Sequence, residues 1–123
     1  MYFATTFASL VVLAGSAAAG CHGSGITWPG GYHVFVAEAE NECRRGRFTG
    51  TFGPNEEKYA CVQYGNGVKL EFRVKNQNGG ASFDLNDDDC LKELRKDIEG
   101  CPRGGNHQQS GWYFSADPNE GRC

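Results

Sequence analysis

The clearest structural signal in the chain is the stretch Tyr64-Gly65-Asn66-Gly67-Val68-Lys69-Leu70-Glu71-Phe72-Arg73-Val74-Lys75. From position 68 onward, apolar side chains alternate with charged ones. Successive side chains of a strand point to opposite faces of a sheet, so this alternation predicts a strand with one buried and one charged face. The Gly-Asn-Gly turn before it predicts a hairpin with a preceding strand over 58–64.

Two amphipathic helices are expected on either side of this hairpin. Apolar residues recur three or four positions apart from Tyr32 to Cys43, which predicts the first helix. Asn86 can cap the second helix, which carries three aspartates in its first turn and ends at Gly100. Each helix therefore has one apolar side that must pack on another element.

Further strands are expected over 47–52 and 111–116, with a turn at 117–119 before the terminal cysteine. The resulting order of helices and strands predicts an α+β fold. We expect a small disulfide-stapled sandwich of about four antiparallel strands with two helices packed on one face.

The first nineteen residues have the pattern of a secretory signal peptide. An apolar run over 7–13 is followed by small residues, with Ala17 and Ala19 just before Gly20. The run is shorter than the roughly 20 residues that span a membrane. We therefore expect a signal peptide at 1–19 and a single cysteine-rich α+β domain at 20–123. The alternative is a bacterial lipoprotein signal, in which Cys21 would carry lipid.

All six cysteines lie in this expected domain, and an even number in a short exported chain predicts three disulfides in an oxidising, extracellular compartment. They are Cys21, Cys43, Cys61, Cys90, Cys101 and Cys123. If 86–99 is helical, Cys90 and Cys101 lie about 16 Å apart along the axis, beyond the roughly 7 Å between Cα atoms that a disulfide allows. These two cysteines should pair elsewhere; the other connectivities stay open.

The charge pattern argues against two classes of partner. The formal net charge is −3, and no basic cluster is longer than Arg44-Arg45. Nucleic acid and anionic membranes are both bound by concentrated basic surfaces, so we expect neither as a partner. We expect a monomer with no cofactor.

An acidic run raises the question of a metal site. Asp84, Asn86 and Asp88 have the spacing that begins a calcium-binding loop. The loop also needs a glycine and a glutamate at positions where this chain has Asp89 and Arg95. We therefore interpret these residues as a helix cap and expect no metal.

No pattern of catalytic residues emerges. The histidines His22, His33 and His107 have no zinc-ligand spacing and are expected at the surface. A small ribonuclease-like hydrolase would combine a histidine, a carboxylate and an arginine, for which His33, Glu40, Arg73 and His107 are candidates. Nothing in the sequence brings those four together, so we expect no enzymatic activity and no catalytic residue.

Aromatic residues are the better candidates for a binding site. Trp28 lies in a loop rich in glycine and proline, while Trp112 and Tyr113 are neighbours on a strand and must face opposite sides. Polar residues at 106 and 108–110 surround this pair, an environment suited to stacking on a sugar or a protein. We interpret Trp28, Trp112 and Tyr113 as possible ligand-facing residues.

Several stretches of the domain, most of them around cysteines, occur together in an order that is typical of one group of proteins. They are Cys21-His22-Gly23-Ser24, Tyr59-Ala60-Cys61-Val62-Gln63, the 68–76 run, Asp89-Cys90-Leu91 leading to Gly100-Cys101, and 111–119 with the terminal Cys123. In these features the chain resembles small cysteine-rich secreted fungal effector proteins, a group with members related in fold to killer toxins. The resemblance implies a secreted, non-enzymatic effector that acts outside the cell by binding a host protein, a glycan or a microbial component. The alternatives are a killer-toxin-like antimicrobial protein and the small ribonuclease-like hydrolase.

Overall fold

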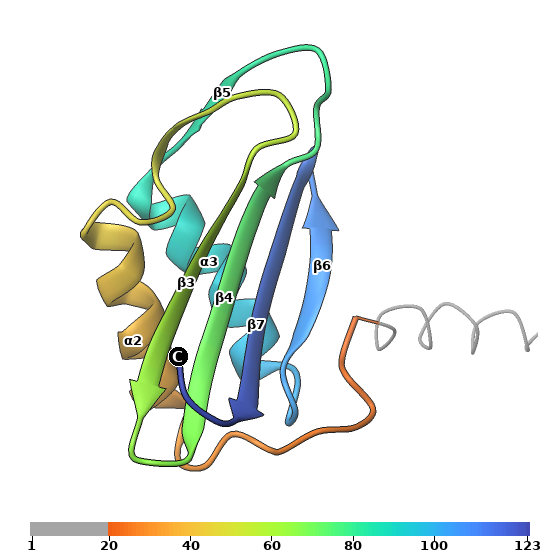
Figure 1. Ribbon diagram of the computed structural model, residues 1–123. Helices are drawn as coiled ribbons and strands as arrows, with labels where there is room; N and C mark the ends of the chain where they lie inside the picture. The colour runs from red at the N-terminus through yellow and green to blue at the C-terminus, as the bar shows by residue number, and fades with distance from the viewer. Residues whose placement is uncertain (1–19) are drawn as a thin grey trace, which may run out of the picture.

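The computed structural model describes residues 20–123, so the expected signal peptide at 1–19 lies outside the described residues. The elements are α2 (Tyr32–Arg44), β2 (Gly50–Phe52), β3 (Glu57–Tyr64), β4 (Val68–Asn76), β5 (Phe83–Leu85), α3 (Asp87–Glu99), β6 (Gly105–Gln109) and β7 (Trp112–Glu120). Both helices lie on one side of a four-stranded sheet (Figure 1). The predicted α+β fold is confirmed.

The main sheet is antiparallel throughout, with the strand order β3-β4-β7-β6. β3 and β4 form the predicted hairpin, and Gly65 in its turn takes a φ of 67°, which glycine adopts without strain. On β4, Leu70, Phe72 and Val74 are fully buried, whereas the charged residues between them are only half-buried. The alternation in the sequence therefore separates the two faces of the sheet.

The core fills the space between this sheet and the two helices. α2 contributes Phe35 and Ala39, and α3 contributes Leu94 and Ile98, all without exposed area. Both helices begin and end close to the predicted positions. Among residues 20–123, no helix is long and apolar enough to cross a membrane.

The structure contains two short strands that the sequence did not reveal. β5 pairs with β2 in a separate two-stranded ladder, so the strand expected over 47–52 is shorter and does not join the hairpin. β6 pairs with β7 at the edge of the main sheet. Its sequence, Gly-Asn-His-Gln-Gln, lacks the alternating apolar residues by which strands are recognised.

The turn expected at 117–119 was wrong. These residues continue β7, in which Pro118 lies opposite Leu70 and Asn119 opposite Lys69. β6 ends its pairing with β7 at Ala116, so β7 has only one neighbouring strand at the proline. A proline is tolerated there because one of the two hydrogen-bond ladders is missing.

Three disulfides use all six cysteines: Cys21–Cys101, Cys43–Cys90 and Cys61–Cys123. Cys90 and Cys101 therefore pair with other elements, as the helix geometry required. One bridge joins α2 to α3, and another ties the C-terminal residue to β3. The sulfur of Cys21 is bonded to Cys101, whereas the lipoprotein alternative requires a Cys21 sulfur free to carry lipid.

Candidate functional site

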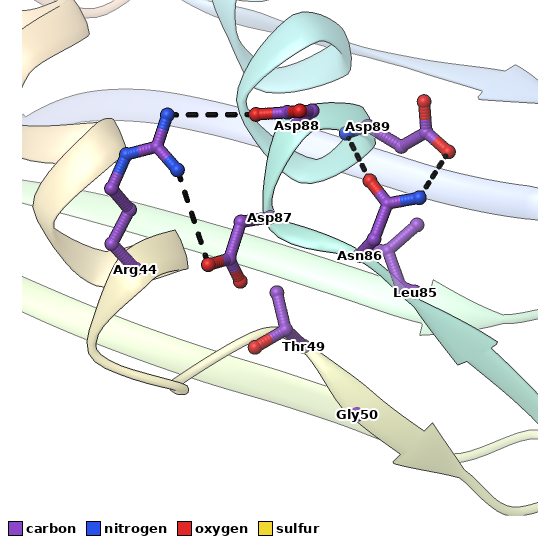
Figure 2. A pocket seen from close by; sticks show the side chains of 8 residues that line it. All are labelled: Arg44, Thr49, Gly50, Leu85, Asn86, Asp87, Asp88 and Asp89. Carbon is purple, nitrogen blue, oxygen red and sulfur yellow. Dashed lines mark hydrogen bonds and ion pairs between the residues drawn. The ribbon is translucent and has the colours of Figure 1, made fainter.

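A polar hollow lies at the beginning of α3 (Figure 2). Three of its charged groups are paired with one another, because the Arg44 guanidinium nitrogens lie 3.9 Å from Asp87 Oδ2 and 3.5 Å from Asp88 Oδ1. The Asn86 side chain accepts a hydrogen bond of 2.8 Å from the backbone N–H of Asp89. This geometry confirms the predicted helix cap, and the ion pairs link α2 to α3.

Trp28, one of the three aromatic candidates, is a core residue. Only 7% of its surface is exposed, and its ring packs on Phe35 with the ring centres 5.1 Å apart. Its indole N–H donates to the carbonyl of Cys101 at 2.8 Å. This environment anchors the loop before α2 and disfavours contact with a ligand.

Trp112 and Tyr113 face opposite sides of the sheet, as neighbours on a strand must. Trp112 is half-buried and packs edge-on against Phe52, with the ring centres 5.0 Å apart. Tyr113 lies opposite Lys75 of β4 and Gln108 of β6, on the side of the sheet away from the helices. The two residues therefore belong to different surfaces.

The residues considered for a hydrolase do not form one site. Arg73 points away from the helices, whereas His107 of β6 points toward α3 and so lies on the other side of the sheet. His107 is half-buried rather than fully at the surface, and both of its ring nitrogens have carboxylate partners. Its Nδ1 lies 3.0 Å from both carboxylate oxygens of Asp97, and its Nε2 lies 2.9 Å from Glu93 Oε1.

These contacts make His107 part of a buried charge cluster. Hydrogen bonding to Asp97 raises the pKa of His107 against the opposing effect of burial, and Glu93 raises it further. Burial also raises the pKa of Asp97. With a carboxylate at each ring nitrogen, the imidazolium form is favoured, which suits a structural cation between α3 and β6 better than a catalytic base.

The side of the main sheet that points away from both helices is here called the open face (Figure 1). It carries every second residue of the four strands, and most of these residues are polar, charged or aromatic. They are Glu57, Tyr59, Cys61 and Gln63 of β3; Lys69, Glu71, Arg73 and Lys75 of β4; Tyr113, Ser115, Asp117 and Asn119 of β7; and Asn106 and Gln108 of β6.

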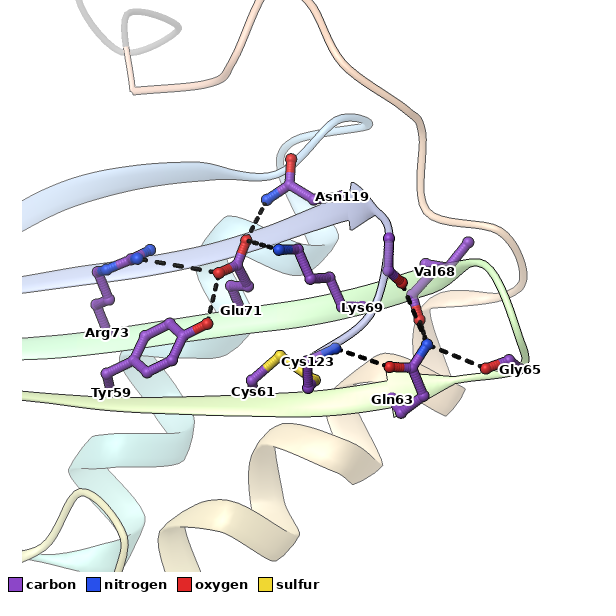
Figure 3. The surroundings of a disulfide bond; sticks show 11 residues. Tyr59, Cys61, Gln63, Gly65, Val68, Lys69, Glu71, Arg73, Asn119 and Cys123 are labelled. Carbon is purple, nitrogen blue, oxygen red and sulfur yellow. Dashed lines mark hydrogen bonds and ion pairs between the residues drawn. A yellow bond between two sulfur atoms is a disulfide. The ribbon is translucent and has the colours of Figure 1, made fainter.

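Four of these side chains, Tyr59, Glu71, Arg73 and Asn119, form what we call the open-face cluster (Figure 3). The Tyr59 hydroxyl donates to Glu71 Oε2 at 2.5 Å, and Asn119 Nδ2 donates to Glu71 Oε1 at 2.7 Å. The Arg73 guanidinium lies 4.6 Å from the centre of the Tyr59 ring. The cluster thus crosses three strands and holds each of its polar groups in one orientation.

The electrostatics of the cluster keep Glu71 ionised. Its side chain is only 14% exposed, and burial by itself would raise the pKa of its carboxyl group. The hydrogen bonds from Tyr59 and Asn119, together with the charges of Lys69 and Arg73, hold that pKa below its usual value. The same hydrogen bond to Glu71 raises the pKa of Tyr59, which keeps the phenol neutral.

The chain end next to the cluster is tied down. Gln63 donates from Nε2 to three backbone carbonyls, including that of Gly121, and accepts from the backbone N–H of Cys123 at 2.9 Å (Figure 3). The disulfide between Cys61 and Cys123 fixes the same segment. The open face is therefore a rigid surface at this end.

A shallow hollow of about 380 Å³ adjoins the cluster, lined by Gly25, Ile26, Lys69, Glu71, Asn119 and Glu120. The amide nitrogen of Asn119 donates two hydrogen bonds, one to Glu71 and one to Asp117 Oδ2 at 3.1 Å. Within residues 20–123, no hydrogen bond uses its amide oxygen. The hollow thus offers an oriented acceptor beside the ammonium group of Lys69.

Sequence reasoning missed the open-face cluster, although it had placed the charged residues of 68–75 on one face. The signal that could have found it is Tyr59, an aromatic residue at a strand position that the hairpin register places beside Arg73. Asn119, which is far from the other three residues in the sequence, could not be predicted as part of the cluster because residues 117–119 had been expected to form a turn.

No curated protein matches the sequence closely enough to serve as a relative. The family model of the glycan binding domain Y3 matches residues 39–123, which include the hairpin, both later strands of the main sheet and the complete open-face cluster. The match covers more than half of the chain and indicates a binding rather than a catalytic role. The chain therefore belongs to the glycan binding domain Y3 family.

Proposed function

We propose that this protein is exported and binds a glycan outside the cell through its open face, with the open-face cluster as the centre of the site. The observation that carries the proposal is the fixed Tyr59 ring beside the oriented polar groups of Glu71 and Asn119. Membership of a glycan-binding family supports the class of ligand. The three disulfides are consistent with an extracellular location.

Tyr59 provides the apolar part of the site. It is 41% exposed, which is unusual for a large side chain in this domain, and both its hydroxyl and one ring face have partners in Glu71 and Arg73. A ring fixed in this way loses little conformational entropy when a ligand packs on it. Pyranose rings offer apolar C–H faces that pack well on such amphipathic aromatic side chains.

Asn119 and Lys69 provide the polar part. The free amide oxygen of Asn119 can accept from a sugar hydroxyl, and the ammonium group of Lys69 can donate to one. Because Glu71 already holds Asn119, the amide does not need to be ordered during binding. Tyr113 lies farther along the same face and extends it for a second sugar ring.

The biological role that we propose is that of a secreted fungal effector, which would bind a glycan of a host or of a competing microbe. The resemblance to cysteine-rich fungal effectors supports this role, as does the absence of a converging catalytic set among the described residues. The net charge of −3 disfavours a toxin that works by attraction to an anionic membrane.

A glycan array tests the molecular part of the proposal. Purified protein should bind a defined set of oligosaccharides, and Tyr59→Ala and Asn119→Ala should each weaken binding at least tenfold, about 1.4 kcal/mol. Tyr32→Ala is the matched control, because Tyr32 is 47% exposed but lies at the start of α2, outside the open face. Equal binding by wild type and Tyr59→Ala, with both proteins folded, would remove the open face from the proposal.

A further inference from the structure

Another cavity lies on the other side of the sheet, between α3 and the β6–β7 hairpin. It has a volume of about 250 Å³ and is more enclosed than the hollow on the open face. We call it the Trp112 pocket, lined by Leu85, Asp89, Lys92, Glu93, Gln109, Ser110, Trp112 and Phe114. The proposed glycan site on the open face uses none of these residues.

The apolar wall of the Trp112 pocket is rigid. Leu85 is 6% exposed and Phe114 is 1% exposed, so both are parts of the core. Trp112 is held edge-on by Phe52 but remains half-buried. Within residues 20–123 its indole N–H donates to no acceptor, in contrast to that of Trp28. A half-buried indole with a free donor is suited to an amphipathic ligand.

The polar wall contains an acceptor that lacks a partner. The Glu93 side chain is 9% exposed, and its Oε1 accepts from Lys96 Nζ at 2.8 Å and from His107 Nε2 at 2.9 Å. No hydrogen bond or ion pair within residues 20–123 uses its Oε2. A buried acceptor without a partner costs about 1–3 kcal/mol, so a ligand hydroxyl that donates to Oε2 would recover stability.

The remaining lining residues define the kind of ligand. The lining includes one further carboxylate, of Asp89, and one ammonium group, of Lys92, whose charges offset each other, and Glu93 is paired with Lys96 and His107. Such a balance of charges favours a neutral ligand over an anion or a cation. The volume is below the roughly 300–1,000 Å³ of pockets for drug-sized molecules, so the pocket has room for a single ring.

From these features we propose that the Trp112 pocket is a second saccharide-binding site, which holds one neutral sugar ring packed on Trp112 with a hydroxyl donating to Glu93 Oε2. The two sites lie on opposite sides of one sheet, since Trp112 and Tyr113 are adjacent and point in opposite directions. A single copy of the domain therefore binds two glycan chains and cross-links them. The cross-linking, but not the pocket itself, rests on the proposed function of the open face.

Nuclear magnetic resonance titration with methyl glycosides of hexoses and N-acetylhexosamines tests the proposal directly. The chain has two tryptophans, so two indole N–H signals are observed. The Trp112 signal should shift as sugar is added. The Trp28 signal should stay fixed, because this indole is buried and bonded to Cys101. Backbone signals should shift in two separate groups, around 59, 71 and 119 and around 109–112.

Variants separate the two sites. Trp112→Ala should raise the dissociation constant for glycoside in the pocket at least tenfold and leave the shifts around Tyr59 unchanged. Tyr59→Ala should raise the dissociation constant of the open face and leave the shifts around 109–112 unchanged. Because Trp112→Ala also removes a contact with Phe52, Gln109→Trp serves as a second variant that blocks the exposed mouth without removing packing. Wild-type protein that sediments as a monomer should cross-link a multivalent neoglycoprotein. This cross-linking should be lost in Trp112→Ala and in Tyr59→Ala.

The outcomes distinguish the two proposals. Shifts confined to the open face, with a fixed Trp112 signal and no effect of Gln109→Trp, would overturn the second site and leave the proposed function intact. Shifts confined to the Trp112 pocket would overturn the open-face site and bivalency while supporting the pocket. No shift with any glycoside tested, together with no binding on the array, would overturn both.

Discussion

Replacing His107 with alanine should destabilise the domain more than any other single change to a histidine. His107 lies between Asp97, whose side chain is 5% exposed, and Glu93, whose side chain is 9% exposed. Within residues 20–123, the Asp97 carboxylate hydrogen-bonds to no other group, whereas Glu93 keeps Lys96. The variant would leave a buried carboxylate unpaired next to another one turn away on α3.

The expected loss follows from this burial. Removing one partner of a buried ion pair typically costs about 3–5 kcal/mol, because the remaining charge is desolvated without compensation. A domain of this size has a total free energy of unfolding of about 5–15 kcal/mol. His107→Ala should therefore remove a large fraction of the stability at pH 6, and Asp97→Asn in the same chain should restore part of it.

The contribution of His107 should depend on pH with a definite sign. Its pKa is raised in the folded state, chiefly by hydrogen bonding to Asp97. The stabilisation is therefore fully present below the unfolded pKa of about 6.5 and is lost as the pH rises through the higher folded pKa. Another histidine, His22, lies 3.7 Å from Asp117, so the difference in free energy of unfolding between wild type and His107→Ala is used to isolate the contribution of His107.

Urea denaturation with intact disulfides, at several pH values between 6 and 9, measures this difference. The difference in free energy of unfolding between wild type and His107→Ala should become smaller as the pH rises. His33→Ala is the control, because His33 is an exposed histidine of α2 and its loss should cost little stability. A loss below about 1 kcal/mol at pH 6, or a gap that is constant with pH, would refute the assigned role of His107.

Three further changes test the framework. Replacing both Cys43 and Cys90 with alanine should cost about 4 kcal/mol by the loop-entropy relation for their separation of 47 residues, measured as a lower urea midpoint; an unchanged midpoint would contradict it. Asn86→Ala should cost about 1 kcal/mol through loss of the α3 cap, with Asn66→Ala in the β3–β4 turn as control. Gly104→Ala should lower the thermal midpoint, costing more than about 1 kcal/mol, because φ is 76° and the new Cβ would lie 2.5 Å from the Ala116 carbonyl oxygen; equal midpoints would disprove this.

Much of the fold could be predicted because its signals are local. The alternation on β4, the turn at Gly65 and the cap at Asn86 each depend on neighbouring residues, and each lies where the sequence placed it. β5 and β6 could not be predicted in this way. They are short strands that exist because a partner strand offers its hydrogen bonds, so their own residues carry little information.

The sites were harder to predict because they join distant residues. Glu71 meets Asn119 across 48 positions, and Glu93 meets His107 across 14 positions through the packing of α3 on β6. Such contacts depend on strand order and register, which composition and spacing do not specify. The aromatic signal was partly informative. Trp112 and Tyr113 both lie at candidate sites, whereas Trp28 is an anchor, since a loop tryptophan gives no indication of which side it faces.

The register of β4 connects the fold to the proposed function. Leu70, Phe72 and Val74 are buried against the helices, and Glu71 and Arg73 lie between them on the open face. A shift of the register by one residue would exchange the two sets, burying the charged residues and exposing the core. The burial energy of three apolar side chains therefore also holds the open-face cluster in position. Because the buried side chains already fix the register of β4, a ligand site on the open face does not have to stabilise it. The open-face side chains can therefore vary to suit a ligand without loss of the register.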